Sequence, residues 1–431
     1  MIISFSVQNF GSIKDKQTLS FEATIDTRLE EAYVINKSGM RLLKLALIYG
    51  PNASGKTMIL EALDFLRLLV LKPKKTKTDR LYFEPFLFDI DTPGKASLLS
   101  IEFLQEGIKY FYEVEFIKTA ILREELFFYE PKRANLYRRT TNLEEQYTSI
   151  TFGSKIKIAK SVKEALETNT LWNNTVLGGF LKTNIKFKEL QPVIEWFKRS
   201  LAPMVASKTI LAQFVTRNIN VGKIKKADMI EQLTKADIHI SDIVITEEDI
   251  TVPEHIIEYI KKDHPNVKSE DLPEKNTKIK SLELVMEHTV NQNKYSLPFD
   301  VESDGTQRYY GLSGLLSLLF HRSMVLPIDE LESSLHPDLY EHFLLSFLLN
   351  AKDSQVIATT HNRELLDKKD FFRNDVIWFT DKDQNCATQL YSLADFDSSV
   401  VRDTTNVRNA YKSGKFGATP RIGDAYIDLN Q

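Results

Sequence analysis

The sequence predicts an α/β fold in which a parallel sheet carries a phosphate-binding loop and an antiparallel sheet forms a subdomain beside it. Three patterns support this prediction. A continuous apolar run, residues 43–49, leads into "GPNASGKT" and a helix, and a second apolar run, residues 324–328, ends in two adjacent carboxylates. Between residues 97 and 129, apolar and polar side chains alternate with the period of half-buried antiparallel strands.

The composition is that of a soluble globular protein. Of 431 residues, 42% are hydrophobic and 27% are charged, and 56 Lys and Arg against 59 Asp and Glu leave a net charge of −3. This balance gives no overall attraction to nucleic acid or to anionic membranes. The single cysteine, Cys386, excludes an internal disulfide framework, and no apolar run approaches the roughly 20 residues that a membrane helix needs. Because the first residues also lack the pattern of a signal peptide, we expect a cytoplasmic protein with no membrane partner.

The N-terminal part, residues 1–150, is rich in predicted strands. Residues 2–10 alternate and can pair with residues 18–23, and the run at 43–49 has the continuous apolar character of a strand buried on both faces. A helix is expected from about Thr57 to Leu71. Three further strands, separated by short polar links that suit an antiparallel sheet, are expected at residues 97–104, 109–117 and 121–129. We therefore assign residues 1–150 to the first half of the predicted α/β domain.

Residues 151–275 differ in pattern and predict an inserted, mainly helical lobe. Helical patterns are found at residues 160–174, 190–204 and 225–237, and the polar stretch 253–276 is expected to be partly loop. No heptad repeat is long enough to form a coiled coil.

The second half of the predicted α/β domain is assigned to residues 276–431. It is expected to begin with strands at residues 281–290 and 294–302, followed by a helix at Thr306–His321. A buried strand at 324–329, a helix from about Asp338 and a strand at 354–361 are expected to follow, in that order. Buried strands with polar tips, each followed by a helix, place ligand groups at the carboxyl ends of a sheet.

The segment "GPNASGKT" matches the phosphate-loop pattern G-x-x-x-x-G-K-[ST] at every fixed position. It follows a buried strand and opens a helix, so a chance glycine-rich turn is the weaker interpretation. Gly50 and Gly55 let backbone N–H groups face a phosphate, and the helix N-terminus adds partial positive charge. Lys56 would neutralise the β- and γ-phosphate oxygens, and Thr57 would offer its hydroxyl to Mg²⁺. The predicted nucleotide-binding residues of this loop are Gly50, Asn52, Ala53, Ser54, Gly55, Lys56 and Thr57.

Asp329 and Glu330 follow an apolar run as adjacent carboxylates, each of which resists the ionisation of the other. A divalent cation beside a phosphate ester would offset this repulsion. We expect Asp329 to hold Mg²⁺ and Glu330 to orient or deprotonate the attacking water. His361, at the end of an apolar strand, would reach a γ-phosphate, although a histidine seen alone in such a place is more often a surface residue.

The order of these motifs resembles the ATP-binding-cassette (ABC) head ATPases, in particular their RecF, Rad50 and SMC-like branch. The phosphate loop is followed by "ESDGTQR", residues 302–308, before a helix, then by the acidic strand end and by the strand that ends in His361. Taken alone, "ESDGTQR" is an ordinary helix N-cap. The resemblance implies that Ser303 and Gly305 cover the γ-phosphate held by a second head. It also implies that "SSLH", residues 333–336, crosses the interface of a dimer or higher homo-oligomer.

A closer similarity is to the bacterial AAA15-type ATPases, which include RloA, AbiLi and the AriA component of PARIS phage-defence systems. It rests on "SVQNFGSIKDKQTLSF", "ESDGTQR", "DELESSLHP" and "NVRNAYKSGKFGATP". The resemblance implies a sensor ATPase that uses ATP and Mg²⁺, responds to a phage protein and controls a separate Toprim-type nuclease. The chain departs from the family pattern where Gly11 replaces a basic residue and where Asp304 and Thr306 replace Gly and Gln, and its glutamine loop is not evident.

Other functions fit the sequence less well. For a GTPase, "DTPG" at residues 91–94 lies in a turn between two predicted strands, and "TKAD" at 234–237 ends a helical pattern instead of a buried strand. A self-sufficient nuclease would need a Toprim domain, for which residues 362–431 are too few. A RecF-like DNA-repair ATPase is the main alternative, because "KPKKTKTDR" at 72–80 and "GKIKK" at 222–226 suit either solvated loops or contacts with DNA phosphates.

Overall fold

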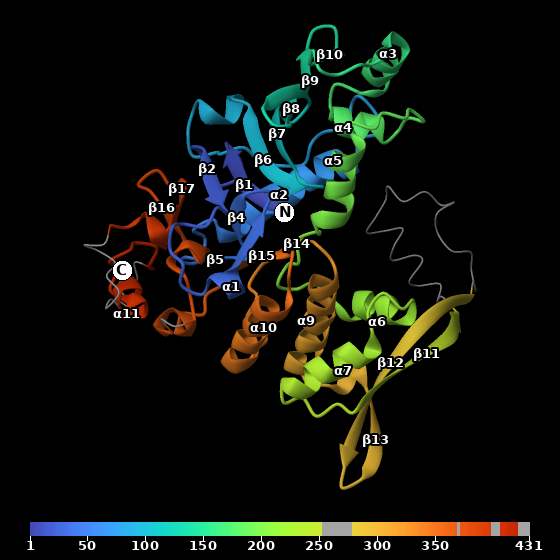
Figure 1. Ribbon diagram of the computed structural model, residues 1–431, viewed down its shortest axis with the longest axis vertical. Coiled ribbons are helices and arrows are strands. Elements are labelled where there is room, and N and C mark those ends of the chain that lie inside the picture. The colour runs from blue at the N-terminus through green and yellow to red at the C-terminus, as the bar shows by residue number, and fades with distance from the viewer. Residues whose placement is uncertain (252–277, 369–370, 398–405, 421–431) are drawn as a thin grey trace, which may run out of the picture. The chain divides into compact units, whose positions relative to one another are not determined.

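The computed structural model describes residues 1–251, 278–368, 371–397 and 406–420, and Figure 1 labels their helices and strands. This part of the chain forms two compact units. The second unit consists of the described residues within Lys208–Leu318 and Ser334–Leu344, and the first unit of the other described residues. Among the helices that the structure describes, none has the length and apolar character needed to cross a lipid bilayer.

A five-stranded sheet in the first unit carries the predicted motifs. Its order is β14 (Val325–Ile328), β15 (Gln355–Thr359), β5 (Leu45–Tyr49), β16 (Ile377–Lys382) and β17 (Thr388–Ser392). The first four strands are parallel, and β17 is antiparallel to β16. β5, β14 and β15 are buried along their whole length, which accounts for their continuous apolar sequences. The carboxyl ends of these three strands lie at one edge of the sheet, and each is followed by a predicted motif.

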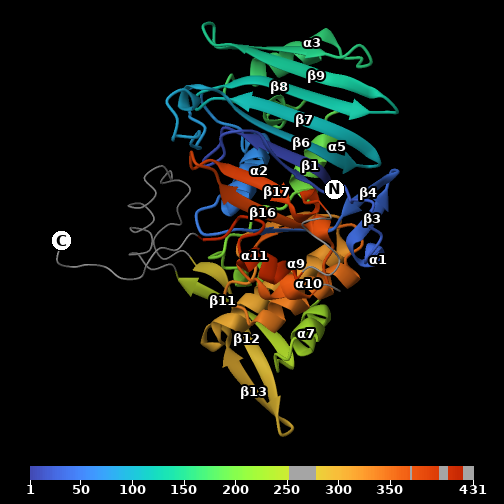
Figure 2. The same ribbon diagram turned by 90° about the vertical axis from the view of Figure 1, so that its left-hand side faces the viewer.

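A seven-stranded antiparallel sheet forms the second layer of this unit. Its order is β10 (Tyr147–Phe152), β9 (Arg133–Asn142), β8 (Ile121–Tyr129), β7 (Ile108–Phe116), β6 (Ser97–Gln105), β1 (Ile2–Gln8) and β2 (Gln17–Ser20). The helix α2 (Lys56–Leu71) lies between the two sheets (Figure 2). Its apolar side chains are buried on both sides, since one side faces β1 and another faces β15.

The two sheets are also joined by the fully buried side chain of Gln355 on β15. Its Oε1 accepts a hydrogen bond from the backbone N–H of Ile2 at 2.6 Å, and its Nε2 donates to the carbonyl oxygens of Ile2 and Leu43, each at 3.0 Å. Because all three contacts are buried, removing the amide would leave backbone groups without partners. Gln355 thus fixes β1 against the sheet that carries the motifs.

The remaining elements of the first unit are short. They are α1 (Glu30–Tyr33), β3 (Val34–Lys37), β4 (Met40–Leu43), α3 (Lys160–Asn169), α4 (Val176–Phe180), α5 (Gln191–Glu195), the π-helical turn Trp196–Ser200, α11 (Val407–Lys412), and 3₁₀ turns at Thr92–Gly94, Glu364–Asp367, Asn374–Val376 and Leu393–Asp395.

The second unit combines helices with a three-stranded antiparallel sheet. Its elements are α6 (Ala212–Asn220), α7 (Lys226–Lys235), β11 (Asp242–Thr251), β12 (Lys278–Val290), β13 (Asn293–Pro298), the 3₁₀ turn Phe299–Val301, and the first parts of α9 (Asp304–His321) and α10 (Pro337–Asn350). Two glycines let α6 approach α9 closely: a Cβ at Gly311 would lie 2.5 Å from Leu211, and one at Gly314 would lie 2.4 Å from Val215.

The predicted fold class is confirmed: the chain has the parallel sheet with its phosphate loop and the antiparallel β subdomain. The compact units nevertheless divide the chain differently from the predicted domains. The described residues of 151–207 pack on the antiparallel sheet, where Trp196 stacks on Phe103 with a centroid distance of 4.1 Å. The predicted head strands at 281–290 and 294–302 lie in the second unit, where β12 pairs with β11 and β13 pairs with β12, so this lobe is mixed α/β. The predicted loop at 253–276 lies outside the described residues.

Candidate functional site

The predicted phosphate loop, Gly50–Thr57, joins the end of β5 to the start of α2. Gly55 has a φ of 102°, and a Cβ there would lie 2.2 Å from the Thr388 hydroxyl, so this position requires glycine. Ala53 also has a left-handed backbone, with a φ of 61°, which is uncommon for a residue with a side chain. Lys56 is buried, and its Nζ donates to the carbonyl oxygens of Gly50 and Pro51 at 3.0 and 3.1 Å. The lysine thus closes the loop on itself.

The back of this loop is held by hydroxyl groups that the sequence analysis did not single out. Thr380 on β16 shares a hydrogen bond of 2.6 Å with the hydroxyl of Ser54, and Thr388 on β17 donates to the Ser54 carbonyl at 2.9 Å. The Ser12 hydroxyl lies 2.8 Å from the Thr388 hydroxyl. Thr380, Thr388 and Ser54 are all buried. The C-terminal hairpin therefore fixes the shape of the phosphate loop.

The acidic pair lies at the end of β14, close to the first turn of α2. The Asp329 Oδ1 accepts hydrogen bonds from the Thr57 hydroxyl at 2.9 Å and from the Thr359 hydroxyl at 2.6 Å. Thr359 in turn accepts the backbone N–H of Glu330 at 2.8 Å. Asp329 is buried, whereas the Glu330 side chain is 44% exposed and its backbone is left-handed, with a φ of 47°. One threonine on β15 thus positions both carboxylate residues.

His361 lies beside the acidic pair. Its Nε2 is 3.9 Å from the Glu330 Oε1, and its backbone N–H donates to the Glu332 carboxylate. Burial lowers the pKa of the imidazole, and the Lys56 ammonium lowers it further against the opposing charges of nearby carboxylates. The pKa of Lys56 is lowered too, chiefly by burial, while Asp329 and two glutamates oppose the shift.

The side chains at the acidic end fit a magnesium ion that is shared with phosphate. Thr57 and Asp329 present oxygen atoms in direct contact, and oxygen ligands are those that Mg²⁺ prefers. Within the described residues, no group of three His, Cys, Asp or Glu side chains could hold a metal alone. This donor set suits Mg²⁺, which takes its other ligands from water and from nucleotide phosphates.

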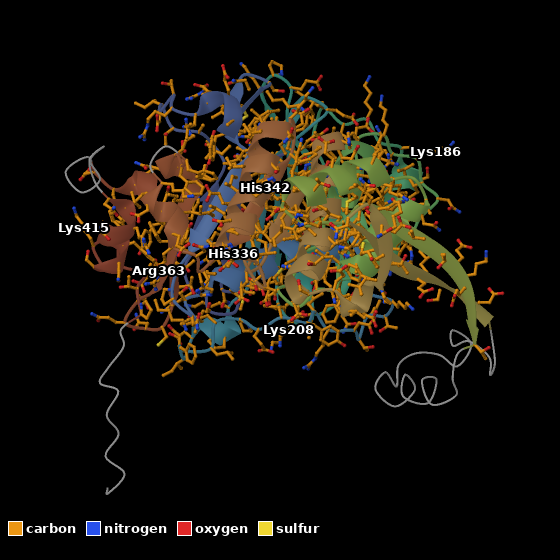
Figure 3. The ribbon with its side chains drawn as sticks, turned by 90° about the horizontal axis from the view of Figure 1, so that it is seen from below. Lys186, Lys208, His336, His342, Arg363 and Lys415 are labelled. Carbon is orange, nitrogen blue, oxygen red and sulfur yellow. The ribbon has the colours of Figure 1, made fainter. Side chains whose placement is uncertain are left out.

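Ser303 and Gly305 lie in the second unit, at the start of α9. The Ser303 Oγ accepts the backbone N–H of Thr306 at 3.2 Å, and a Cβ at Gly305 would lie 3.3 Å from the Ser334 carbonyl oxygen. His336, at the end of the predicted interface segment, is 69% exposed at its side chain (Figure 3). The predicted site residues are thus divided: the phosphate loop, the acidic pair and His361 meet in the first unit, and Ser303 and Gly305 belong to the second.

A segment that sequence patterns did not reveal borders the acidic strand. Leu201 and Val205 form parallel bridges to Val325 and Ile328, and the Asp329 backbone N–H donates to the Val205 carbonyl at 2.8 Å. Directly after this segment, at Ser207, the chain leaves the first unit. Residues 201–208, "LAPMVASK", contain no glutamine. The helix expected at 190–204 is therefore wrong for its last residues, since the helical turns end at Ser200 and isolated bridges leave no periodic pattern in the sequence.

The two motifs that favoured a GTPase lie outside this site. The "DTPG" segment forms the 3₁₀ turn at Thr92–Gly94, and Thr234 of "TKAD" lies within α7. "DTPG" is a turn, as expected, and "TKAD" lies at the end of a helix instead of the buried strand that a guanine-binding motif would require.

Comparison with known proteins shows a family match over most of the chain. The model of the family described as "AAA domain, putative AbiEii toxin, Type IV TA system" matches residues 45–367. Among solved structures, an SMC head bound to the C-winged helix domain of ScpA is similar with a TM-score of 0.47 and 12% identity, covering 91% of this chain and 97% of that one. The SMC head domain from Thermotoga maritima and an SMC head with an extended coiled coil, bound to a ScpA domain derived from Pyrococcus furiosus, each have a TM-score of 0.40 and 12% identity. Each of these two matches covers 91% of this chain. The match covers 98% of the Thermotoga maritima chain and 96% of the chain with the extended coiled coil. No curated protein matches the sequence.

Proposed function

The chain belongs to the family of AAA domains described as putative AbiEii toxins of type IV toxin–antitoxin systems, and on this premise we propose that it is an ABC-type ATPase that hydrolyses ATP with Mg²⁺. The observation that supports this most strongly is the contact between Thr57 in the phosphate loop and Asp329 at the end of β14. It brings the two predicted magnesium ligands together from positions far apart in the sequence.

Each residue of the site has a distinct role in this proposal. The loop backbone and Lys56 bind the β- and γ-phosphates, and Thr57 and Asp329 hold Mg²⁺, which neutralises phosphate charge when bound. Glu330, exposed at the rim, orients the attacking water and accepts its proton. His361, whose pKa is lowered by burial, is neutral near pH 7 and donates a hydrogen bond to the terminal phosphate.

We further propose that the ATPase acts as a switch in a homo-dimer or higher homo-oligomer. Ser303 and Gly305 would then cover the nucleotide of a second copy, with residues 333–336 at the interface. The switch would control a separate Toprim-type nuclease in response to a phage protein. ATP-dependent association, measured by light scattering with and without Mg-ATP, tests the first step of this proposal.

A RecF-like ATPase that binds DNA is the second candidate, and the basic segment 72–80 supports it. The Asn173 amide donates to the carbonyl oxygens of Thr76 and Asp79 at 2.8 and 2.9 Å, and Asn174 forms two hydrogen bonds with the backbone of Lys74. The segment is thus held in place with several lysines at its surface. DNA-stimulated ATP hydrolysis, with a steep loss of binding as salt rises, would favour this candidate over the nuclease switch.

Turnover with ATP and its dependence on metal test the central proposal. We expect the purified chain to release phosphate from ATP in the presence of Mg²⁺ and to lose this activity when EDTA removes the metal. Activity should return on adding excess Mg²⁺. A chain that binds no ATP at all, or that hydrolyses it equally well in EDTA, would contradict the proposal.

The hydroxyl contacts behind the loop predict a specific effect of Thr388. Thr388→Val keeps the shape of the side chain but leaves the Ser54 carbonyl without its buried donor, so we expect ATP affinity to fall by about 5- to 30-fold. Thr388→Ser keeps the hydroxyl and should bind ATP nearly as well as the wild type. Isothermal titration calorimetry on both variants checks this. Equal affinities for the valine and serine variants would remove the hydroxyl from any positioning role.

A further inference from the structure

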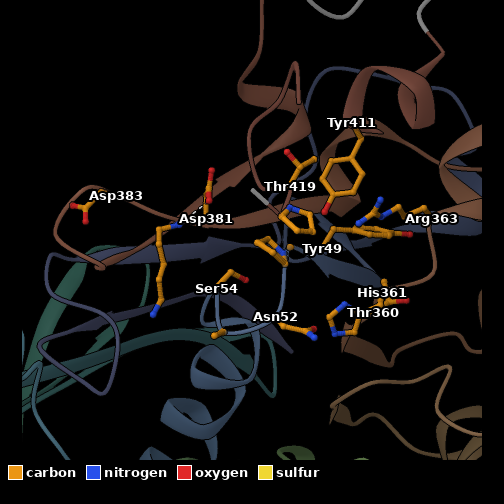
Figure 4. Close-up of a pocket in the computed structure, with 15 residues that line it drawn as sticks. Tyr49, Asn52, Ser54, Thr360, His361, Arg363, Asp381, Asp383, Tyr411 and Thr419 are labelled. Carbon is orange, nitrogen blue, oxygen red and sulfur yellow. Dashed lines mark hydrogen bonds between the residues drawn. The ribbon is translucent and has the colours of Figure 1, made fainter. Parts of the chain in front are cut away.

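A cavity of about 730 Å³ opens on the phosphate loop (Figure 4). Residues 50–54 of the loop line one side of it, and Thr360, His361 and Arg363 line a second side. The end of β16 and the C-terminal segment, defined here as residues 406–420, complete the wall with Asp381, Lys382, Asp383, Tyr411, Thr419 and Pro420. All of these residues belong to the first unit. The C-terminal part of the wall lies outside the family match at residues 45–367.

Of the two Lys and Arg side chains in this wall, Lys382 carries an ammonium and Arg363 a planar guanidinium. Its guanidinium lies over the Tyr411 ring, 5.4 Å from the centroid, and within the described residues it makes no ion pair. The two carboxylates of the wall are occupied by backbone donors. Asp381 accepts the N–H groups of Lys382 and Ala418, each at 2.8 Å, and Asp383 accepts those of Asn385 and Ala387, also at 2.8 Å. These N–H donors take up carboxylate oxygens that could otherwise pair with Arg363, so its guanidinium is left available to an anion although the wall has as many Asp as Lys and Arg side chains.

The C-terminal segment fixes the ring that supports Arg363. The Tyr411 hydroxyl donates to the Ala418 carbonyl at 2.7 Å, and the ring stacks on Phe379 with a centroid distance of 5.2 Å. Tyr391 anchors the same segment by donating to the Phe416 carbonyl at 2.7 Å. A guanidinium that stacks on a ring keeps its N–H groups in one plane, where they can bind two oxygens of an anion. Arg363, marked in Figure 3, is thus oriented without an acidic partner.

We propose that Arg363 binds the terminal phosphate of the ATP held by the loop, so that the site distinguishes ATP from ADP. This inference rests on the proposed function. His361, two residues earlier, lines the same cavity, and its Nε2 lies 3.9 Å from the Glu330 Oε1. Because Glu330 is the proposed base, the reacting end of the triphosphate lies on this side of the loop. ATP carries roughly four negative charges at neutral pH, of which Mg²⁺ and Lys56 offset about three. Arg363 adds a positive charge on the side of the loop that His361 lines.

Arg363→Gln tests this inference through the difference between two nucleotides. Because a charge-assisted contact to the terminal phosphate is lost, ATP affinity should fall by roughly 10- to 100-fold, while ADP affinity changes by less than about twofold. The ATP affinity of Arg363→Lys should lie between that of the glutamine variant and that of the wild type. The matched control is Arg199→Ala, because the Arg199 side chain is 82% exposed and does not line this cavity. Titration calorimetry with ATP and ADP, both in Mg²⁺ and under conditions that prevent turnover, gives the affinities.

The outcomes separate this inference from the proposed function. If Arg363→Gln weakens the binding of ATP and of ADP equally, the arginine has a structural effect only, and the inference is overturned. Unchanged affinity for both nucleotides would overturn it too. In either case the wild-type chain would still bind ATP and the proposed function would stand. A wild-type chain that binds neither nucleotide would instead overturn the proposed function, and this inference with it.

Discussion

Lys56→Ala should reduce ATP affinity by roughly 100- to 1,000-fold, the largest loss of binding that we expect from one substitution. The Lys56 side chain is 6% exposed and donates to two carbonyl oxygens of the loop, so its ammonium is held where phosphate oxygens would lie. Burial lowers the pKa of this group, and the negative charge of an approaching triphosphate opposes that shift. Alanine removes both the charge and the hydrogen bonds. Titration calorimetry with Mg-ATP measures the loss.

Lys44→Ala is the matched control for this variant. Lys44 is also 6% exposed, and its Nζ donates to the Leu348 carbonyl at 3.0 Å, but it lies at the other end of β5 from the phosphate loop. Its replacement should lower the thermal midpoint of unfolding and leave the ATP affinity of the folded chain unchanged. If Lys56→Ala binds ATP as tightly as Lys44→Ala does, the loop is not the nucleotide site.

The sequence predicted those parts of the site that are encoded locally. The phosphate loop is a contiguous motif between a buried strand and a helix, and the acidic pair and His361 each follow an apolar run. Because the carboxyl ends of neighbouring parallel strands meet at one edge, these local patterns were enough to bring Lys56, Asp329 and His361 together.

The parts that the sequence did not predict depend on contacts between distant residues. Thr380 and Thr388 act on the loop from a hairpin more than 300 residues away, and a buried threonine looks the same in a sequence whether or not its hydroxyl has a partner. The strand β9 was missed because a bulge at Leu136 places Leu136 and Tyr137 both in the core, which breaks the expected alternation.

The compact units divide the chain differently from the predicted domains for a related reason. Amphipathic helices at 160–174 and 190–204 indicate that one face is buried but not what covers it. In the structure, the antiparallel sheet supplies that partner. The buried Glu124 on β8 accepts the backbone N–H of Val176 at 2.8 Å, and the Trp196 ring stacks on Phe103. These contacts attach the helical segment to the first unit, and the chain enters the second unit only after Ser207.

Glu330→Gln should leave ATP binding intact and reduce the rate of hydrolysis by about 100- to 10,000-fold. The backbone of Glu330 is held by Thr359 in a left-handed conformation that directs its half-exposed carboxylate toward the rim of the site, near His361. Glutamine has the same shape and can still hydrogen-bond a water molecule, but it cannot accept the proton of the attacking water. The substitution therefore separates the binding of ATP from its cleavage, and phosphate release together with titration calorimetry measures both.

Glu332→Gln is the control for this variant, because Glu332 is a neighbouring carboxylate with a different contact. It accepts the backbone N–H of His361, and glutamine can accept the same hydrogen bond through its amide oxygen. We expect its turnover to fall by less than about tenfold. If Glu330→Gln turned ATP over as fast as the wild type, Glu330 would not be the base. If instead both variants lost turnover equally, the loss would follow from removing negative charge near His361, and proton transfer at Glu330 would not explain it.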